Sequence, residues 1–407
     1  MAVDSLGNIL VAGYLDGSMK LLNKANNTSI LLTPVGLADY FLAKFDSKGD
    51  VLWGKTFGDA VAQGIVIRVA VDAANNVGIA GTLAGSANFG GGVITATGAS
   101  DIFAAKFDAL GTHTWSTHFG AAGNLDGGNA IAFDTAGNVL VGGYSIHALN
   151  VGGTVFPDTA SMDGFVAKLS GTTGSVVWAK QYAEQSGQPV GSQYVDYLAT
   201  DSANNVFIAG RFSGSIYLKT STSALSSGNV PDIFLAKIAS DGTTVWGKTI
   251  GTTTTDSPDA MTLDSSGNVL LAGRIGAAFD FGGGLLGSNG EFLAQYTNAG
   301  AYAHATIIED ISYGAEGLAT DPSDNVYVAG YAYIKNQLSA GGVRKVDATL
   351  APLWLKSNTD VHGRAAGYDK LHNRLVFAAY IVSAINFGTG VLTPAGGGDL
   401  GLAQFQP

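Results

Sequence analysis

The sequence contains no cysteine, and only 9 of its 407 residues are proline. The absence of cysteine excludes a disulfide framework, a thiolate metal site and a thiol nucleophile. Charged residues are also scarce, at 13% of the chain, roughly half of the usual share. A disordered chain would combine many charges with few apolar residues, whereas 46% of these residues are hydrophobic. We therefore expect a folded chain with a large apolar core.

Positive charge is in short supply as well. The chain has 21 Lys and Arg against 32 Asp and Glu, which gives a formal net charge of −11. Nucleic acids and anionic membrane surfaces attract basic proteins, so we expect neither as a partner. No apolar run is long enough to cross a bilayer, and Met1 does not open a signal peptide, so we expect no membrane span.

One short motif recurs along the whole chain. An aspartate is followed by a Gly-Asn or Asn-Asn pair and then by a short β-branched or apolar run that ends in Gly or Ala. The seven copies begin at Asp4, Asp72, Asp134, Asp201, Asp264, Asp321 and, in degenerate form, Asp369. Asp at the first position and Gly or Asn at the fourth favour a tight turn. The motif therefore predicts strand, turn and strand, and it indicates that each aspartate caps a turn and does not bind a metal.

Two further landmarks follow most copies. The first has the form Asp-x-Phe-x-Ala-Lys, as in Asp101–Lys106, and the second is a tryptophan that follows a turn. All five tryptophans of the protein occupy this position: Trp53, Trp115, Trp178, Trp246 and Trp354. Each repeat thus holds four strands, here named A to D in chain order. A Gly-rich hairpin, as in Asn88–Gly92, is expected between strands B and C.

Four short antiparallel strands repeated seven times predict an all-β fold, a seven-bladed β-propeller in one domain. The expected blades are residues 1–60, 61–121, 122–190, 191–253, 254–309, 310–361 and 362–407. The last blade is incomplete because no strand D follows its strand C. We expect either that the chain is a domain excised from a longer protein or that a partner supplies a strand to this open edge. We expect the tryptophans to fill the wedges between adjacent blades.

The order Asp-x-x-Gly-Asn-Val, Phe-Gly-Gly-Gly, Asp-x-Phe-x-Ala-Lys and Gly-x-x-x-Trp resembles the SBBP β-propeller repeats of bacteria. The resemblance implies a secreted or cell-surface bacterial protein, in a family generally without an assigned activity. It implies no catalytic residues.

The best candidate for a ligand site is a set of polar residues just before strand A of successive repeats. Counting five residues back from each turn aspartate gives Ile67, Asn129, Asp196, Asp259, Glu316 and Arg364. The five polar members would line one mouth of the central channel. Converging carboxylates and amides could hold a divalent ion such as Ca²⁺. The alternative interpretation is a solvated rim of polar loops.

We therefore carry two function hypotheses. The first is a non-catalytic binding or scaffolding module without a cofactor, whose partner is an unknown protein or a glycan. Recognition would then use the face that carries the B–C and D–A loops, because variable loops on a rigid scaffold are common recognition sites. Tyr194, Tyr197 and Tyr313 on that face are compatible with carbohydrate binding. The alternative is a metal-assisted hydrolase or lyase with its site at the channel mouth.

Overall fold

The computed structural model describes the chain except for a few short segments. These are residues 65, 160, 185–189, 219–223, 288, 310, 335–336, 359–360, 382, 384, 387–390, 393–398 and 406–407. The described residues form strands and turns and contain no helix. In consequence, none of them belongs to a helix that could cross a membrane.

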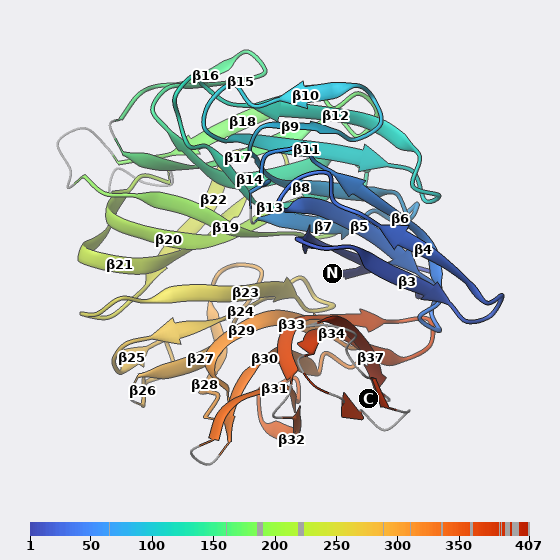
Figure 1. Cartoon of the computed structure of the whole chain (residues 1–407). Coiled ribbons are helices and arrows are strands. Elements are labelled where there is room, and N and C mark those ends of the chain that lie inside the picture. The colour runs from blue at the N-terminus through green and yellow to red at the C-terminus, as the bar shows by residue number, and fades with distance from the viewer. Residues whose placement is uncertain are drawn as a thin grey trace. The chain divides into compact units, whose positions relative to one another are not determined.

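The fold is the expected all-β, seven-bladed β-propeller. In the described residues, six blades are antiparallel sheets of four strands, and the seventh sheet has three. The chain divides into two compact units, Met1–Thr249 and Ile250–Pro407. The first unit contains blades 1 to 4 and the second contains blades 5 to 7 (Figure 1).

Within the first unit, each blade follows the A–B–C–D order. Blade 1 consists of β1 (Ala2–Val3), β2 (Ile9–Leu15), β5 (Asp39–Phe45) and β6 (Val51–Phe57). Blade 2 consists of β7 (Ile67–Val71), β8 (Val77–Leu83), β11 (Asp101–Phe107) and β12 (His113–Phe119). Blade 3 consists of β13 (Gly127–Phe133), β14 (Val139–Ile146), β17 (Met162–Leu169) and β18 (Val176–Tyr182). Blade 4 consists of β19 (Gln193–Thr200), β20 (Val206–Ile216), β21 (Leu225–Ile238) and β22 (Thr244–Ile250).

The second unit has the same order. Blade 5 consists of β23 (Ser257–Leu263), β24 (Val269–Ile275), β27 (Gly290–Tyr296) and β28 (Tyr302–Ile307). Blade 6 consists of β29 (Ile311–Thr320), β30 (Val326–Ile334), β31 (Gln337–Val346) and β32 (Pro352–Asn358). Blade 7 consists of β33 (Val361–Asp369), β34 (Arg374–Ile381) and β37 (Asp399–Phe405), with β37 at the edge of its sheet.

Five two-stranded hairpins lie between strands B and C of their blades in the described residues. They are β3–β4 (Met19–Asn23, Thr28–Leu32), β9–β10 (Ser86–Asn88, Val93–Thr95), β15–β16 (Leu149–Val151, Thr154–Phe156), β25–β26 (Phe279–Asp280, Leu285–Leu286) and β35–β36 (Ile385–Asn386, Val391–Leu392). Phe89 anchors the hairpin of blade 2, because its buried ring contacts Phe57 and Phe103 with centroid distances of 4.9 Å. The glycines let the turn approach strand D closely, since a β-carbon at Gly91 would lie 2.3 Å from His113.

The aspartate of each A–B turn is a turn cap, as predicted. In blade 1, Asp4 Oδ1 accepts hydrogen bonds from the backbone N–H groups of Leu6 and Asn8. The other carboxylate oxygen, Oδ2, lies 2.8 Å from Nζ of Lys44 on strand C, and both side chains are buried. The two sequence landmarks, the turn aspartate and the lysine of Ala-Lys, are therefore the two halves of one ion pair.

The same pair occurs in most blades and is replaced in two. Nζ–Oδ2 distances of 2.8–3.5 Å join the pairs Lys106–Asp72, Lys168–Asp134, Lys237–Asp201 and Lys345–Asp321. In blade 5 the lysine is replaced by Gln295, whose amide donates to Asp264. In blade 7 it is replaced by Gln404, and Arg374 supplies the charge 3.1 Å from Asp369.

The A–B turns alternate between two forms in blades 1 to 6. In blades 1, 3 and 5 the fourth turn residue is a glycine with positive φ, whereas in blades 2, 4 and 6 it is Asn75, Asn204 or Asp324 in the same left-handed conformation. Each of these three side chains accepts a hydrogen bond from the backbone N–H of the preceding blade, donated by Ser5, Thr135 and Ser265 respectively. These hydrogen bonds between A–B turns therefore link blade 1 to blade 2, blade 3 to blade 4 and blade 5 to blade 6.

Tryptophans of strand D pack against the C–D turn of the next blade. Trp53 lies against Gly111, and the indole N–H groups of Trp115 and Trp178 donate to the carbonyls of Gly171 and Ser240. Trp246 contacts Phe207 of its own blade, at a centroid distance of 6.1 Å. Trp354 packs against the apolar cluster that joins blades 6 and 7.

Candidate functional site

The five polar residues selected from the sequence share one backbone feature. Strand A of blades 3 to 7 contains a β-bulge, at which one residue has no partner on strand B. The bulged residues are Asn129, Asp196, Asp259, Glu316 and Arg364. A bulge turns one side chain away from the regular alternation of a strand and is frequent beside active sites. The first strands of neighbouring blades lie side by side within each unit, β7, β13 and β19 in one and β23, β29 and β33 in the other (Figure 1).

Blade 2 departs from this pattern, because Ile67, five residues before its turn aspartate, is not at a bulge. Strand β7 pairs with β8 without a register shift, so it lacks the extra residue that the bulge adds to strand A of blades 3 to 7. Ile67 is buried in the apolar core between blades 1 and 2. The exposed residue of this strand is Arg68, whose charge acts on Asp196.

In the first unit, the bulged residues form a small polar cluster. The amide of Asn129 donates to Asp196 Oδ1 at 3.1 Å, and Arg211 Nε lies 3.0 Å from Asp196 Oδ2. Burial raises the pKa of Asp196 even though the Arg211 guanidinium opposes that shift. The guanidinium also covers the ring of Tyr194, 4.9 Å from its centroid, and Tyr194 meets Tyr144 edge-on at 5.2 Å.

In the second unit, each bulged acid faces an arginine. Arg274 Nε lies 3.3 Å from Asp259 Oδ2, and Arg364 Nη1 lies 3.8 Å from Glu316 Oε1. The two arginine side chains are about half exposed, at 49% and 52%. Each of these arginine side chains is therefore accessible to solvent beside its acid.

Three aromatic rings extend this charged row in blades 6 and 7. His362 lies between Tyr331 and Tyr380, with centroid distances of 5.1 and 5.9 Å. The Arg364 guanidinium lies over the ring of Tyr331 at 5.6 Å. Tyr380 is 39% exposed, and the other two rings are partly exposed. We call Glu316, Tyr331, His362, Arg364 and Tyr380 the unit-2 rim cluster.

Most partners of the bulged residues were not among the residues predicted from the sequence. Tyr144, Arg211, Arg274, Tyr331 and Tyr380 all occupy one repeat position, directly after the Gly or Ala that ends the apolar run of strand B. That shared position was a usable signal, because a strand residue next to the bulge on the neighbouring strand must lie beside it. Of the tyrosines considered for carbohydrate binding, Tyr194 lies beside Arg211 and Tyr144 in the first unit, while the side chain of Tyr313 lies outside the described residues.

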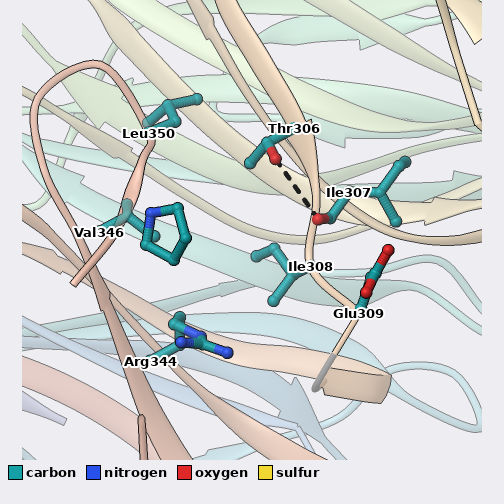
Figure 2. A pocket seen from close by; sticks show the side chains of 8 residues that line it. Thr306, Ile307, Ile308, Glu309, Arg344, Val346 and Leu350 are labelled. Atoms are coloured by element: carbon teal, nitrogen blue, oxygen red, sulfur yellow. Dashed lines mark hydrogen bonds between the residues drawn. The ribbon is translucent and has the colours of Figure 1, made fainter. Parts of the chain in front are cut away.

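A second feature is a hollow between blades 5 and 6, where three repeat residues are exchanged together. His304 replaces the tryptophan, Leu350 replaces the glycine of the facing turn, and Arg344 replaces the alanine of Ala-Lys. Figure 2 shows Arg344, Leu350 and Ile308 around the resulting space, with Glu309 at its side. Arg344 and Leu350 line this hollow, whereas His304 is not among its lining residues.

No three His, Asp or Glu side chains within the described part of the chain lie close enough together to hold a metal ion. The bulged acids instead face Arg211, Arg274 and Arg364. Calcium binding therefore stays an untested prediction.

Known structures are similar to this chain in fold. A polysaccharide lyase, PL25 ulvanlyase, is 10% identical with a TM-score of 0.51, and the match covers 91% of this chain and 93% of that one. A protein of unknown function from Dyadobacter fermentans is 12% identical, with a TM-score of 0.45 and coverages of 83% and 93%. Another from Bacteroides caccae is 11% identical, with a TM-score of 0.41 and coverages of 78% and 90%. At these identities the likeness concerns the fold alone.

No curated protein matches the sequence. One family model does, the SBBP β-propeller repeat, over residues 114–149. This stretch begins in strand D of blade 2 and ends in the hairpin of blade 3. The seven blades repeat the same strand order, so the resemblance to this family is confirmed, and the chain carries the SBBP β-propeller repeat.

Proposed function

We propose that this protein is a non-catalytic binding module that recognises a glycan through the unit-2 rim cluster. The observation that carries the proposal is the run of three partly exposed rings, Tyr331, His362 and Tyr380, from three strands of two blades. Aromatic side chains that are apolar on their faces and polar at their tips suit ligands with both kinds of surface, as sugar rings have.

The charged neighbours supply the directional contacts that such a ligand needs. Arg364 and Glu316 are 52% and 40% exposed and lie beside the rings. A guanidinium offers several N–H donors and a carboxylate only acceptors, so the pair can bond hydroxyl groups in both roles. A few polar groups placed beside apolar contact area are typical of ligand sites.

We further propose that the module is a scaffold of a secreted or cell-surface bacterial protein and that it works without a cofactor. The SBBP repeat supports this placement, because the repeat resembles those of bacterial surface proteins. Strand donation to the edge strand β37 is an additional way in which a partner protein could bind.

The alternative, a metal-assisted hydrolase or lyase, would need the bulged acids for the metal. In the structure Asp196, Asp259 and Glu316 each face an arginine at 3.0–3.8 Å, which compensates their charge within the protein. Calorimetry with Ca²⁺, Mn²⁺ and Zn²⁺ tests the alternative, and a strong heat of binding that Glu316→Gln and Asp259→Asn abolish would favour it.

The binding proposal is tested by calorimetry with a panel of neutral and acidic oligosaccharides. We expect one class to bind and Tyr331→Ala or Tyr380→Ala to weaken its affinity by about tenfold, which equals about 1.4 kcal/mol. Tyr14→Ala is the matched control, because Tyr14 occupies the same repeat position in blade 1 and is 56% exposed. Equal losses in all three variants, or no binding to any member of the panel, would contradict the proposal.

A further inference from the structure

Glu291 is an acid at a repeat position that is otherwise apolar. It lies on strand C of blade 5, where the other blades with described side chains place residues such as Tyr40, Ile102 and Ile233. Glu291 is only 1% exposed. Burying a carboxyl group is costly unless it is hydrogen-bonded, so an acid at this buried position needs hydrogen-bond partners.

The side chain reaches the bulge of the next blade. Glu291 Oε1 accepts a hydrogen bond from the backbone N–H of Ala315 at 3.0 Å. Ala315 directly precedes Glu316, the bulged residue of blade 6 that belongs to the unit-2 rim cluster. The carboxyl group of Glu291 therefore holds the backbone that presents Glu316 to Arg364.

The second contact of Glu291 is with Asp259, the bulged residue of blade 5. The other carboxyl oxygen of Glu291, Oε2, is buried and accepts no hydrogen bond from the described residues, while the charge of Asp259 acts on the same carboxyl group. Two ionised carboxylates are both acceptors, so a hydrogen bond between Glu291 and Asp259 requires a proton on one of them. Burial raises the pKa of Glu291, and the negative charge of Asp259 raises it further. Burial also raises the pKa of Asp259, against the opposing charge of Arg274.

The charges around the pair balance only while that proton is present. Arg274 faces Asp259 from strand β24, and Glu316 acts on Asp259 from strand β29 as a like charge. Arg364 on β33 faces Glu316 in turn, and His362 lies on the same strand. With one shared proton, two carboxylates face two guanidinium groups. Without it, a third negative charge is buried next to the bulge.

We propose that Glu291 is a positioning residue of the unit-2 rim site. Its protonated carboxyl group ties Asp259 to the Ala315–Glu316 bulge, and loss of that proton loosens the bulge and weakens glycan binding. The inference rests on the proposed function, because it names the regulation of the same site.

Two variants separate the role of the proton from that of the side chain. Glu291→Gln keeps an oxygen for the Ala315 N–H and an N–H donor for Asp259, so it imitates the protonated state at every pH. Glu291→Ile installs the residue of blades 2 and 4 and removes both bonds. With the oligosaccharide that binds wild type, we expect wild-type affinity to fall about tenfold between pH 5 and pH 9. Glu291→Gln should bind equally well at both pH values, and Glu291→Ile should bind at least tenfold more weakly at pH 5.

Affinity for Glu291→Gln as poor as for Glu291→Ile would overturn the inference, as would a wild-type pH dependence that persists in Glu291→Gln. Amide hydrogen exchange of the ligand-free proteins gives a readout that does not depend on the proposed function. At one fixed pH, protection of residues 314–317 should match wild type in Glu291→Gln and be lost in Glu291→Ile. Exchange that is equal in all three proteins would refute the positioning role even if no glycan binds.

Discussion

At the scale of the residue, one buried ion pair accounts for two of the three sequence landmarks. The turn aspartate and the lysine of Ala-Lys lie far apart in each repeat but meet at 2.8 Å in blades 1 and 3. The turn-capping role of the aspartate could be predicted from local chemistry. Its lysine partner could not, because strand C reaches the A–B turn only through the register of the folded sheet. The replacement of lysine by Gln295 in blade 5 shows that the turn tolerates a neutral donor.

Removing the lysine should therefore destabilise a blade strongly. Lys44→Met leaves Asp4 buried without its cation, and such a loss typically costs about 3–5 kcal/mol. Lys48→Met is the control, because Lys48 is exposed in the C–D turn of the same blade and its loss should cost about 0.5 kcal/mol or less. Urea unfolding of the two variants measures both values, and similar costs for both would contradict the account.

The left-handed residues of the even-numbered blades make a second test. Asn204 accepts hydrogen bonds from the N–H and the hydroxyl of Thr135, both at 2.8 Å, with a φ of 63°. Asn204→Ala loses both bonds and places an alanine in the left-handed region, for a combined cost of about 2–3 kcal/mol. Asn204→Gly loses the same bonds without the backbone strain and should cost about 1–2 kcal/mol less than the alanine variant. If glycine destabilises as much as alanine in thermal unfolding, the strain argument is wrong.

At the scale of the element, the sequence predicted the strands and the Gly-rich hairpins, but not what the hairpins do. Asn88 Oδ1 accepts hydrogen bonds from the backbone N–H groups of Gly90 and Gly92, which explains why an Asn precedes the glycines of this hairpin. The packing of Phe89 on Phe57 joins two blades and has no local signature. The bulges of strand A were likewise invisible as bulges. Counting back from the turn aspartate of blade 2, whose strand A has no bulge, gives the core residue Ile67.

The hairpin of blade 2 should therefore contribute to stability as well as covering strand D. Phe89→Ala removes a ring that is 2% exposed and should cost about 3–5 kcal/mol. Val93→Ala, on the same hairpin but 67% exposed, should cost about 0.5 kcal/mol or less. Denaturant unfolding that shows a small effect for Phe89→Ala would indicate that the hairpin is only loosely attached.

At the scale of the whole molecule, the residues that the repeats share specify the scaffold. Residues that depart from the repeat specify the candidate site. Glu291, Arg274 and His362 stand out only after the seven copies are aligned, and their mutual distances depend on contacts between blades. The sequence thus predicted the seven-bladed fold and the row of bulged residues. It did not predict the ion pairs and aromatic contacts that this row makes.

The acids of the chain fall into two groups with opposite effects on stability. Burial would raise the pKa of Asp4 and Asp134, but hydrogen bonds from lysine and asparagine outweigh it and lower the pKa. Their stabilisation is present above an unfolded pKa of 3.8 and is lost as pH falls through the folded value. Burial raises the pKa of Asp126 and Asp163 from 3.8 to about 6, so these groups reduce stability as pH rises from 3.8 through 6. Thermal unfolding should therefore show its highest midpoint at about pH 4, and a midpoint that climbs steadily from pH 4 to pH 7 would contradict this assignment.

The central claim is that the unit-2 rim cluster binds the ligand. A hydrogen-exchange footprint tests this claim most directly. The full chain is compared with and without a saturating oligosaccharide chosen from the binding panel. The account predicts new protection in residues 314–317, 329–332, 361–366 and 378–381, with the A–B turns at 321–325 and 369–373 unchanged. Protection confined to those turns, or spread over the edge strand β37 alone, would place the binding surface elsewhere and contradict the account.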